Sequence, residues 1–571
     1  MKGGLAVRRK GGNVGGVLRI SAVLLAVSAY PPIRLSAQSL NDTTRRAVDS
    51  VFRAYDKTDS PGCSLGIYRD GRIIYSRGYG MANLELGIAN SPKTVFDIGS
   101  TSKQFSAFAI GLLAKEGKLS LDDPIRKHIP ELGPYADVIK LGDLVHHTSG
   151  LRDYLTLMYL AGFRFDDVTD DQDALNLIVK QKAANFPPNS EWLYSNTGYF
   201  LLSQVVKRVS GQTLREFATA RMFGPLNMTE THFHDDHTMI VPNRATGYSP
   251  GDSGGYTIEM SGFEQTGDGA VQTTVEDMLK WDQNWYDGTV GGKDLLEVQQ
   301  RTGKLTNGED HHYAAGLFIS TYRGLKSVRH GGAWAGYRAE LLRFPDQHTS
   351  IACLCNRGDA DPSSFADQVA DVVLASSLQP KPAAVASNGT PTSATPSLPP
   401  EVLAARAGVW RSPKTSDIYV LEVKENRLQL SLGARSIPLT PLATNKFQLG
   451  PYTLVFEDAP KPVLKVERDG RVDDAYERLP ATTPDPAGLA AYAGKWYSEE
   501  LSTTWDLVPD GNGLRVEVRS RPLFTARAVS KDLFSGGQAH LSFTRDRKGA
   551  LDGFTVNAGR VRGIGFIRVA R

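Results

Sequence analysis

The first part of the chain switches between helical and extended patterns of apolar residues. Residues 41–57 place their apolar side chains on one face of a helix: Val48, Val51, Phe52 and Tyr55. Residues 63–79 alternate apolar and polar positions on both sides of a polar turn at residues 69–72. This alternation is typical of two strands joined by a tight turn, so it predicts a β-hairpin.

A largely helical middle then gives way to extended segments and a last helix. The later predicted strands lie at residues 327–329, 338–344 and 350–355. Apolar residues at helical spacing predict a closing helix over residues 365–374. This order indicates an α+β domain, placed at residues 38–377, whose antiparallel sheet is built from both ends of the domain.

Composition changes after the predicted domain. Residues 378–400 are rich in Pro, Ala, Ser and Thr with almost no large apolar residue, which is typical of an extended linker. Beyond the linker, alternating segments and turn residues predict two small all-β domains of the barrel type, at residues 401–480 and 486–571.

The two tail domains repeat a short motif. Residues 407–412 (Ala-Gly-Val-Trp-Arg-Ser) match residues 493–498 (Ala-Gly-Lys-Trp-Tyr-Ser). We expect Trp410 and Trp496 to lie in barrel cores rather than to stack on a ligand, because large aromatic side chains are highly buried on average. The length of 571 residues also exceeds what one hydrophobic core serves, which agrees with several domains.

Charge is nearly balanced, with one basic cluster at the start of the chain. The net charge is only +3 and acids and bases are interspersed, so no nucleic-acid partner is expected. Basic residues precede a short apolar stretch at residues 20–30, and small residues at 35–37 resemble a cleavage site. Residues 1–37 therefore predict a secretory signal peptide, a periplasmic or secreted location, and no stable membrane span after cleavage. The alternatives are an uncleaved anchor or a misassigned start codon.

The candidate chemistry begins with the run Ser100–Lys103, where a lysine follows a serine by three residues. That spacing puts both side chains on one face of a helix, and apolar positions over residues 104–116 predict the helix that follows. A helix N-terminus favours developing negative charge, which suits a nucleophile. The alternative is that Ser100 or Ser102 simply caps the helix.

Two further motifs occur once each in the chain and follow Ser100 in order. These are Tyr194–Asn196 (Tyr-Ser-Asn) and His330–Gly332 (His-Gly-Gly). Alone, Tyr194 is compatible with a core aromatic before a helix, and His330 with an ordinary strand residue before a glycine turn. Three such matches in one order are hard to attribute to chance.

With these motifs, residues 40–375 resemble the serine β-lactamase and penicillin-binding protein superfamily. The resemblance is to the branch of class C β-lactamases, D-aminopeptidases, DD-peptidases and esterases, and it implies a β-lactamase/transpeptidase-like fold. Residues 147–151 (His-Thr-Ser-Gly-Leu) and 267–273 (Gly-Asp-Gly-Ala-Val-Gln-Thr) agree with it. One departure from the class A pattern is that the third motif begins with His330 rather than lysine.

A serine hydroxyl needs a neighbouring base before it can act as a nucleophile. Burial and a second cation would lower the pKa of Lys103, and adjacent positive charge would draw Tyr194 towards phenolate. The sequence leaves both residues open as the base. We expect a coupled Lys103–Tyr194 pair that takes the proton from Ser100 and returns it to the leaving group.

The resemblance also implies the groups that bind the substrate. The backbone N–H groups of Ser100 and Ala333 would form the oxyanion hole, with Gly332 allowing a close approach of the substrate. Asn196 would bond the substrate amide, or alternatively serve a structural hydrogen bond. His330 would bond the substrate or Tyr194.

The residue types favour one substrate class over others. Because a histidine is largely neutral at pH 7, the sequence indicates weak selection for a free carboxylate, unlike a lysine at position 330. We therefore expect peptide-like amides with D-residues as substrates, as for a D-aminopeptidase or DD-peptidase. A carboxylesterase or weak β-lactamase is the alternative within the fold, and a non-hydrolytic binding or scaffold protein is the alternative outside it.

Neither a metal nor another cofactor is expected. The adjacent pairs at 146–147 and 311–312 lack the spacing of metal ligands, and the three cysteines are too few for a disulfide framework. Cys353 and Cys355 would share one face of a strand. If the sheet follows the family, one of them lies near Cys63, but buried thiols are the preferred interpretation.

The tail resembles the paired eight-stranded β-domains of D-aminopeptidases. The resemblance implies that a loop from a β-domain reaches the active site, although no segment of this sequence identifies such a loop.

Overall fold

A computed structural model describes most of the chain. The described residues are 39–380 and 398–569, except 433–434, 451, 459, 469–470 and 481–485. The expected signal peptide and most of the expected linker therefore lie outside the described residues.

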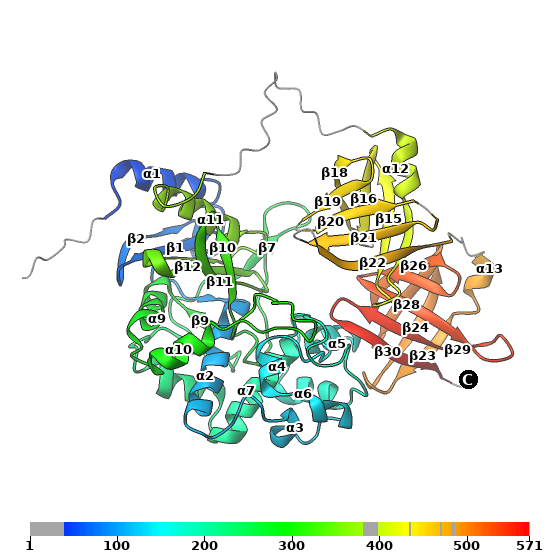
Figure 1. Ribbon diagram of the computed structural model, residues 1–571, viewed down its shortest axis with the longest axis horizontal. Coiled ribbons are helices and arrows are strands. Elements are labelled where there is room, and N and C mark those ends of the chain that lie inside the picture. The colour runs from blue at the N-terminus through cyan, green and yellow to red at the C-terminus, as the bar shows by residue number, and fades with distance from the viewer. Residues whose placement is uncertain are drawn as a thin grey trace, which may run out of the picture. The chain divides into compact units, whose positions relative to one another are not determined.

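The first domain is built on a six-stranded antiparallel sheet in the order β10-β11-β12-β13-β1-β2 (Figure 1). Its strands are β1 (Cys63–Arg69), β2 (Arg72–Tyr79), β10 (Phe318–Tyr322), β11 (Leu325–Trp334), β12 (Tyr337–Phe344) and β13 (Thr349–Cys355). β1 pairs with β13, so the sheet joins the two ends of the domain, and the predicted α+β arrangement is confirmed.

Helices from both ends of the domain cover one face of the sheet. They are α11 (Pro362–Val373), which packs on β12 and β13, and α1 (Asp42–Val51), which packs against α11 (Figure 1). Phe52 stacks on Tyr79 with ring centroids 4.4 Å apart, and Phe365 meets Phe52 edge-on at 5.3 Å. The apolar side chains that the sequence places at helical spacing in α1 and α11 thus form one buried layer on the sheet.

The helical middle packs against the other face through α9 (Val275–Asp287). Its remaining helices are α2 (Lys103–Lys115), α3 (Ile125–His128), α4 (Leu141–Val145), α5 (Tyr154–Leu160), α6 (Asp171–Val179), α7 (Asn196–Ser210), α8 (Leu214–Ala218) and α10 (Gly292–Gln299). Short strands complete it: β3 (Met81–Asn83), β4 (Ile88–Ala89), β5 (Phe96–Asp97), β6 (His232–Phe233), β7 (Tyr248–Pro250), β8 (Tyr256–Ile258) and β9 (Val271–Thr273). α2 lies against α7, which brings the Ser100 and Tyr194 motifs into one region.

The preference for buried thiols is wrong for two of the three cysteines, whereas the expected closeness of one of Cys353 and Cys355 to Cys63 is confirmed. Cys63 on β1 lies directly opposite Cys355 on β13, and the two form a disulfide. Cys353 is a buried thiol, as expected. The partners are 292 residues apart in sequence, so their pairing depends on the sheet register.

The C-terminal part forms two β-domains. The first is a nine-stranded, barrel-like antiparallel sheet in the order β17-β16-β15-β14-β22-β21-β20-β19-β18. It follows α12 (Pro400–Arg406) and contains β14 (Gly408–Arg411), β15 (Ile418–Lys424), β16 (Arg427–Leu432), β17 (Arg435–Pro438), β18 (Thr440–Ala443), β19 (Lys446–Leu449), β20 (Tyr452–Glu457), β21 (Val463–Arg468) and β22 (Arg471–Leu479).

The second β-domain is a closed eight-stranded barrel, named barrel 2 below (Figure 1). After α13 (Pro486–Leu489) it contains β23 (Gly494–Ser498), β24 (Thr503–Asp510), β25 (Gly513–Val518), β26 (Arg521–Ser530), β27 (Leu533–Gly536), β28 (Ala539–Arg545), β29 (Leu551–Ala558) and β30 (Val561–Arg568).

The repeated tryptophans occupy equivalent core positions. Trp410 and Trp496 are almost completely buried, as predicted. Each indole N–H donates to the carbonyl oxygen four residues earlier, Arg406 at 3.2 Å and Tyr492 at 3.1 Å. The sequence repeat therefore reflects a structural repeat.

Barrel 2 packs on the first domain through buried polar contacts. Arg152 forms an ion pair with Glu500, and their side chains are 5% and 9% exposed. The indole N–H of Trp505 donates to the carbonyl oxygen of Leu160 at 2.9 Å. Because an unpaired buried charge is costly, this interface depends on both partners of the ion pair.

Arg152→Met should destabilise the protein by about 3–5 kcal/mol, because it leaves the Glu500 carboxylate buried without its cation. The matched control is Lys182→Met, which removes an exposed ion pair with Glu499 at the same interface (62% and 73% exposed) and should cost at most about 1 kcal/mol. Thermal unfolding of the two variants measures the difference. Equal midpoints would contradict the assigned role of the buried pair.

Candidate active site

Strand β11 comes unusually close to the turn that carries Ser100. Ser100 lies in a 3₁₀ turn, Gly99–Ser102, directly before α2. A Cβ on Gly332 would meet the carbonyl oxygen of Ile98 at 1.9 Å, and Gly99, at φ +48°, faces the backbone of Ala333. Both glycines are therefore required for the strand to lie against the nucleophile turn.

Lys103 is buried beside Ser100. Its Nζ lies 3.1 Å from Ser100 Oγ and donates to Asn196 Oδ1 at 2.9 Å and to the Asp268 carbonyl oxygen at 2.5 Å. Burial lowers the pKa of Lys103 to about 7, although the negative charge of Asp268 opposes this and the charge of Arg560 adds to it. A substantial fraction of Lys103 is therefore an uncharged amine at neutral pH.

Tyr194 stands over the lysine. Its ring centroid lies 4.8 Å from Lys103 Nζ and 4.2 Å from the His147 ring. The phenol oxygen is buried and makes no well-formed hydrogen bond among the described residues, although Ser100 lies close enough to lower the pKa of Tyr194. Burial raises the pKa of Tyr194 above its usual range, so the phenol is protonated at neutral pH.

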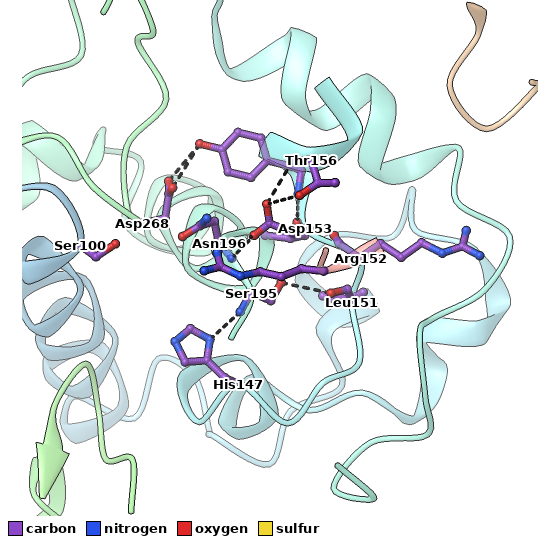
Figure 2. A network of polar contacts seen from close by, with 12 residues as sticks. Ser100, His147, Leu151, Arg152, Asp153, Thr156, Ser195, Asn196 and Asp268 are labelled. Carbon is purple, nitrogen blue, oxygen red and sulfur yellow. Dashed lines mark hydrogen bonds and ion pairs between the residues drawn. The ribbon is translucent and has the colours of Figure 1, made fainter. Parts of the chain in front are cut away.

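A small network holds the Tyr194–Asn196 segment in place (Figure 2). The N–H of Ser195 donates to His147 Nδ1 at 3.2 Å, and the N–H of Asn196 donates to Asp153 Oδ2 at 2.8 Å. Burial lowers the pKa of His147 well below its usual value, so the ring is neutral and accepts this bond. The histidine is structural, as its place in the family signature implies.

Three consecutive residues link the site to its surroundings. Arg152 binds Glu500 of barrel 2, Asp153 binds the Asn196 backbone, and the Tyr154 hydroxyl donates to the Asp268 carboxylate at 3.1 Å. Asn196 and Asp268 are both partners of Lys103. Sequence reasoning gave no role to Asp153, Tyr154 or the Asp268 carboxylate, although Asp268 lies inside a quoted motif.

His330 does not bond Tyr194, which was one of its two expected partners. Its Nε2 lies 3.0 Å from the Tyr313 hydroxyl, and its Nδ1 lies 2.6 Å from the carbonyl oxygen of Gly331. Burial lowers the pKa of His330 to about 3, so the ring is neutral as the sequence indicated. Both nitrogens are engaged by the protein, and neither bonds Tyr194.

These elements surround a cavity of about 770 Å³. Its wall includes the motif residues Ser100, Tyr194, Asn196, His330, Gly332 and Ala333. One side is aromatic: Trp334 lies 5.4 Å from Phe165 and 5.5 Å from Phe263, measured between ring centroids. The cavity thus combines the Ser100 hydroxyl with an apolar surface, and ligand sites commonly pair a few polar groups with an apolar lining.

Barrel 2 contributes Arg560 to the same cavity. Arg560 lies in the turn between β29 and β30, and its Cζ stands 4.7 Å from the centroid of the Tyr194 ring. No motif or periodicity marks this residue in the sequence. The turn is the segment by which a β-domain reaches the site, a contact that the family resemblance implied without locating it.

Comparison with known proteins agrees with this geometry. The β-lactamase family matches residues 48–375, more than half of the chain. The chain belongs to the β-lactamase family. It is accordingly a β-lactamase-related serine hydrolase, with relatives named D-aminopeptidase and penicillin-binding protein.

Similarity extends beyond the first domain in some relatives. A D-aminopeptidase of Cereibacter sphaeroides (strain KD131 / KCTC 12085) is 27% identical over 482 residues, covering 81% of this chain and 84% of the relative. Penicillin-binding protein 4* of Bacillus subtilis (strain 168) is 28% identical over 337 residues, covering 56% of this chain and 73% of the relative.

A solved structure shows the same fold. The octameric penicillin-binding protein homologue from Pyrococcus abyssi superposes with a TM-score of 0.54 at 23% identity, covering 76% of this chain and 99% of that one. Within the described residues, no helix of this chain is long and apolar enough to cross a membrane.

Gly332→Ala should reduce the rate at which a fluorophosphonate labels Ser100 by about 100-fold, because its Cβ would push β11 away from the nucleophile turn. The neighbouring change Gly331→Ala is the control, since its Cβ meets only the end of the Glu340 side chain, at 3.0 Å. Labelling is followed by intact mass. Equal rates in the two variants would show that the close approach of β11 is not needed.

Proposed function

We propose that this enzyme hydrolyses peptide-like amides that contain D-residues, through an acyl-enzyme on Ser100. The observation that carries the proposal is the buried amine of Lys103, 3.1 Å from the Ser100 hydroxyl and with a pKa near neutrality. A general base works best when its pKa lies near the operating pH.

In this mechanism uncharged Lys103 accepts the proton of Ser100 as the Oγ attacks the substrate carbonyl. The backbone N–H groups of Ser100 and Ala333 stabilise the oxyanion, in line with the close approach of β11. Protonated Lys103 and the neutral phenol of Tyr194 then return a proton to the leaving nitrogen. The raised pKa of Tyr194 favours Lys103 over Tyr194 as the base of acylation.

The substrate class rests on relatives and on the cavity wall. Some relatives named D-aminopeptidase match 81–89% of this chain, so their likeness includes the β-domains. The aromatic surface of Phe165, Phe263 and Trp334 suits an apolar side chain next to the scissile bond. Small peptides or amino-acid amides of D configuration fit both observations.

We further propose that the enzyme is exported to the periplasm or secreted. This rests on the basic and apolar pattern of residues 1–37, which lie outside the described part of the chain. N-terminal sequencing of the protein recovered from its native host would reveal cleavage near residue 37.

A substrate panel tests the reaction class. We expect turnover of D-Ala-p-nitroanilide and of D-Ala-D-Ala peptides, with the L-isomers cleaved at least about 10-fold more slowly and all activity lost in Ser100→Ala. Hydrolysis of p-nitrophenyl acetate alone would replace the peptidase assignment by an esterase, and hydrolysis of nitrocefin alone by a β-lactamase. Absence of any Ser100 adduct with fluorophosphonate or penicillin would instead favour a binding protein.

The pH dependence of acylation tests the base. Because Lys103 must be uncharged, the rate should fall as pH drops through about 7. Asp268→Asn removes an anion that raises the pKa of Lys103. The pH at which the acylation rate falls should therefore move to lower pH by about one pH unit.

The control for that shift is Asp97→Asn. Burial raises the pKa of Asp97 to about 7, so this carboxyl in the same cavity titrates over the same range. Fluorophosphonate labelling of both variants across neutral pH separates the two groups. Lys103 would be excluded as the base if the fall in labelling rate at low pH disappeared in Asp97→Asn and stayed at the same pH in Asp268→Asn.

A further inference from the structure

The active site contains a cation that the family motifs do not supply. Arg560 is 43% exposed and forms part of the wall of the 770 Å³ cavity that contains Ser100. It also borders a second cavity, of about 1090 Å³, that is lined mainly by barrel 2. Leu155, Phe165 and Asn196 line both spaces as well, so Arg560 stands where they meet.

The backbone around Arg560 is anchored on the first domain. The Arg560 carbonyl oxygen accepts from Asn185 Nδ2 at 2.9 Å, and the N–H of Arg562 donates to Asn185 Oδ1 at 2.8 Å. The turn is tight, because Ala558 pairs with Val561 and Gly559 takes a positive φ of 51°. This anchoring fixes the backbone from which the Arg560 side chain reaches Tyr194.

Within the described part of the chain, no group accepts a hydrogen bond from the Arg560 guanidinium. Its one carboxylate within 4 Å among the described residues is Asp153, at 3.7 Å, too far for a hydrogen bond. Asp153 is already used, because its Oδ2 accepts from the Asn196 N–H and its Oδ1 from the Thr156 N–H. The five N–H donors of Arg560 are therefore available to a ligand.

Arg560 lies next to the residue that serves the leaving nitrogen in the proposed mechanism. Its Cζ is 4.7 Å from the ring centroid of Tyr194, the residue that returns a proton to the leaving nitrogen in the proposed mechanism. In a peptide whose last residue is the leaving group, the carboxylate carbon is two bonds from that nitrogen. A planar guanidinium binds a carboxylate through two parallel hydrogen bonds.

We propose that Arg560 selects substrates whose leaving residue carries a free C-terminal carboxylate. The inference rests on the proposed function, because it assigns the leaving-group subsite of that same reaction. The enzyme would then be a carboxypeptidase for short D-residue peptides. It would cleave them faster than substrates whose leaving group is an uncharged amine. The carboxylate is recognised by barrel 2 rather than by position 330, where this chain has a neutral histidine.

Binding tests the inference without requiring turnover. In the Ser100→Ala background, calorimetry would compare the dipeptide D-Ala-D-Ala with its C-terminal amide. We expect the free acid to bind about 10- to 100-fold more tightly, the range expected for hydrogen bonds between charged groups. A further Arg560→Gln change should abolish this preference, and Arg560→Lys should retain only part of it, because an ammonium lacks the fork of donors.

Arg519→Gln is the matched control. Arg519 is another barrel 2 cation at this interface, with its Cζ 4.4 Å from the Phe163 ring centroid, so its loss should leave the preference for the acid intact. Equal affinity for acid and amide, or a preference that survives Arg560→Gln, would overturn the inference. Failure of the proposed function would show separately, as the absence of D-amide turnover by the unmodified enzyme.

Discussion

Burial of one amine next to one hydroxyl is the constraint around which the active site is arranged. In water a lysine side chain is almost entirely protonated at neutral pH and so cannot accept the proton of serine, whereas burial of Lys103 disfavours its charged form. The protein replaces that hydration with two oxygen acceptors, one on Asn196 and one on the Asp268 backbone. These hydrogen bonds position the Lys103 amine, while its burial leaves part of the population uncharged.

The supports of that amine lead outward to barrel 2. Arg152, Asp153 and Tyr154 are neighbours in sequence, but their side chains reach Glu500, the Asn196 backbone and the Asp268 carboxylate. A change in the docking of barrel 2 would therefore alter the positions of Asn196 and Asp268, the two partners of Lys103. Together with Arg560, these contacts make barrel 2 part of the active site.

Charge in the cavity is divided between the two parts of the protein. The first domain provides a neutral His330 and a lysine whose charge burial disfavours, and barrel 2 provides a permanent cation. This division allows the reacting groups to remain close to neutrality while the guanidinium attracts an anion. Substrate specificity therefore depends on barrel 2, a domain that carries none of the three motifs.

Local patterns in the sequence were sufficient to predict many of the elements and the closeness of Lys103 to Ser100. The three-residue spacing of Ser100 and Lys103 brings them together within a single turn, and alternation predicted the hairpin of β1 and β2. The repeated motif around the tryptophans at 410 and 496 predicted two similar β-domains, because each tryptophan fills the same core position in its domain. Each of these inferences uses contacts between residues that are close in the chain or are repeated in it.

Only the tertiary structure decided the disulfide, the partners of His330 and the place of Arg560. Cys63 and Cys355 meet because β1 lies beside β13, and a one-residue change of register would separate them. Arg560 reaches Tyr194 across 366 positions of sequence, through the docking of one domain on another. Such contacts follow from how surfaces pack, and no periodicity within a segment encodes them.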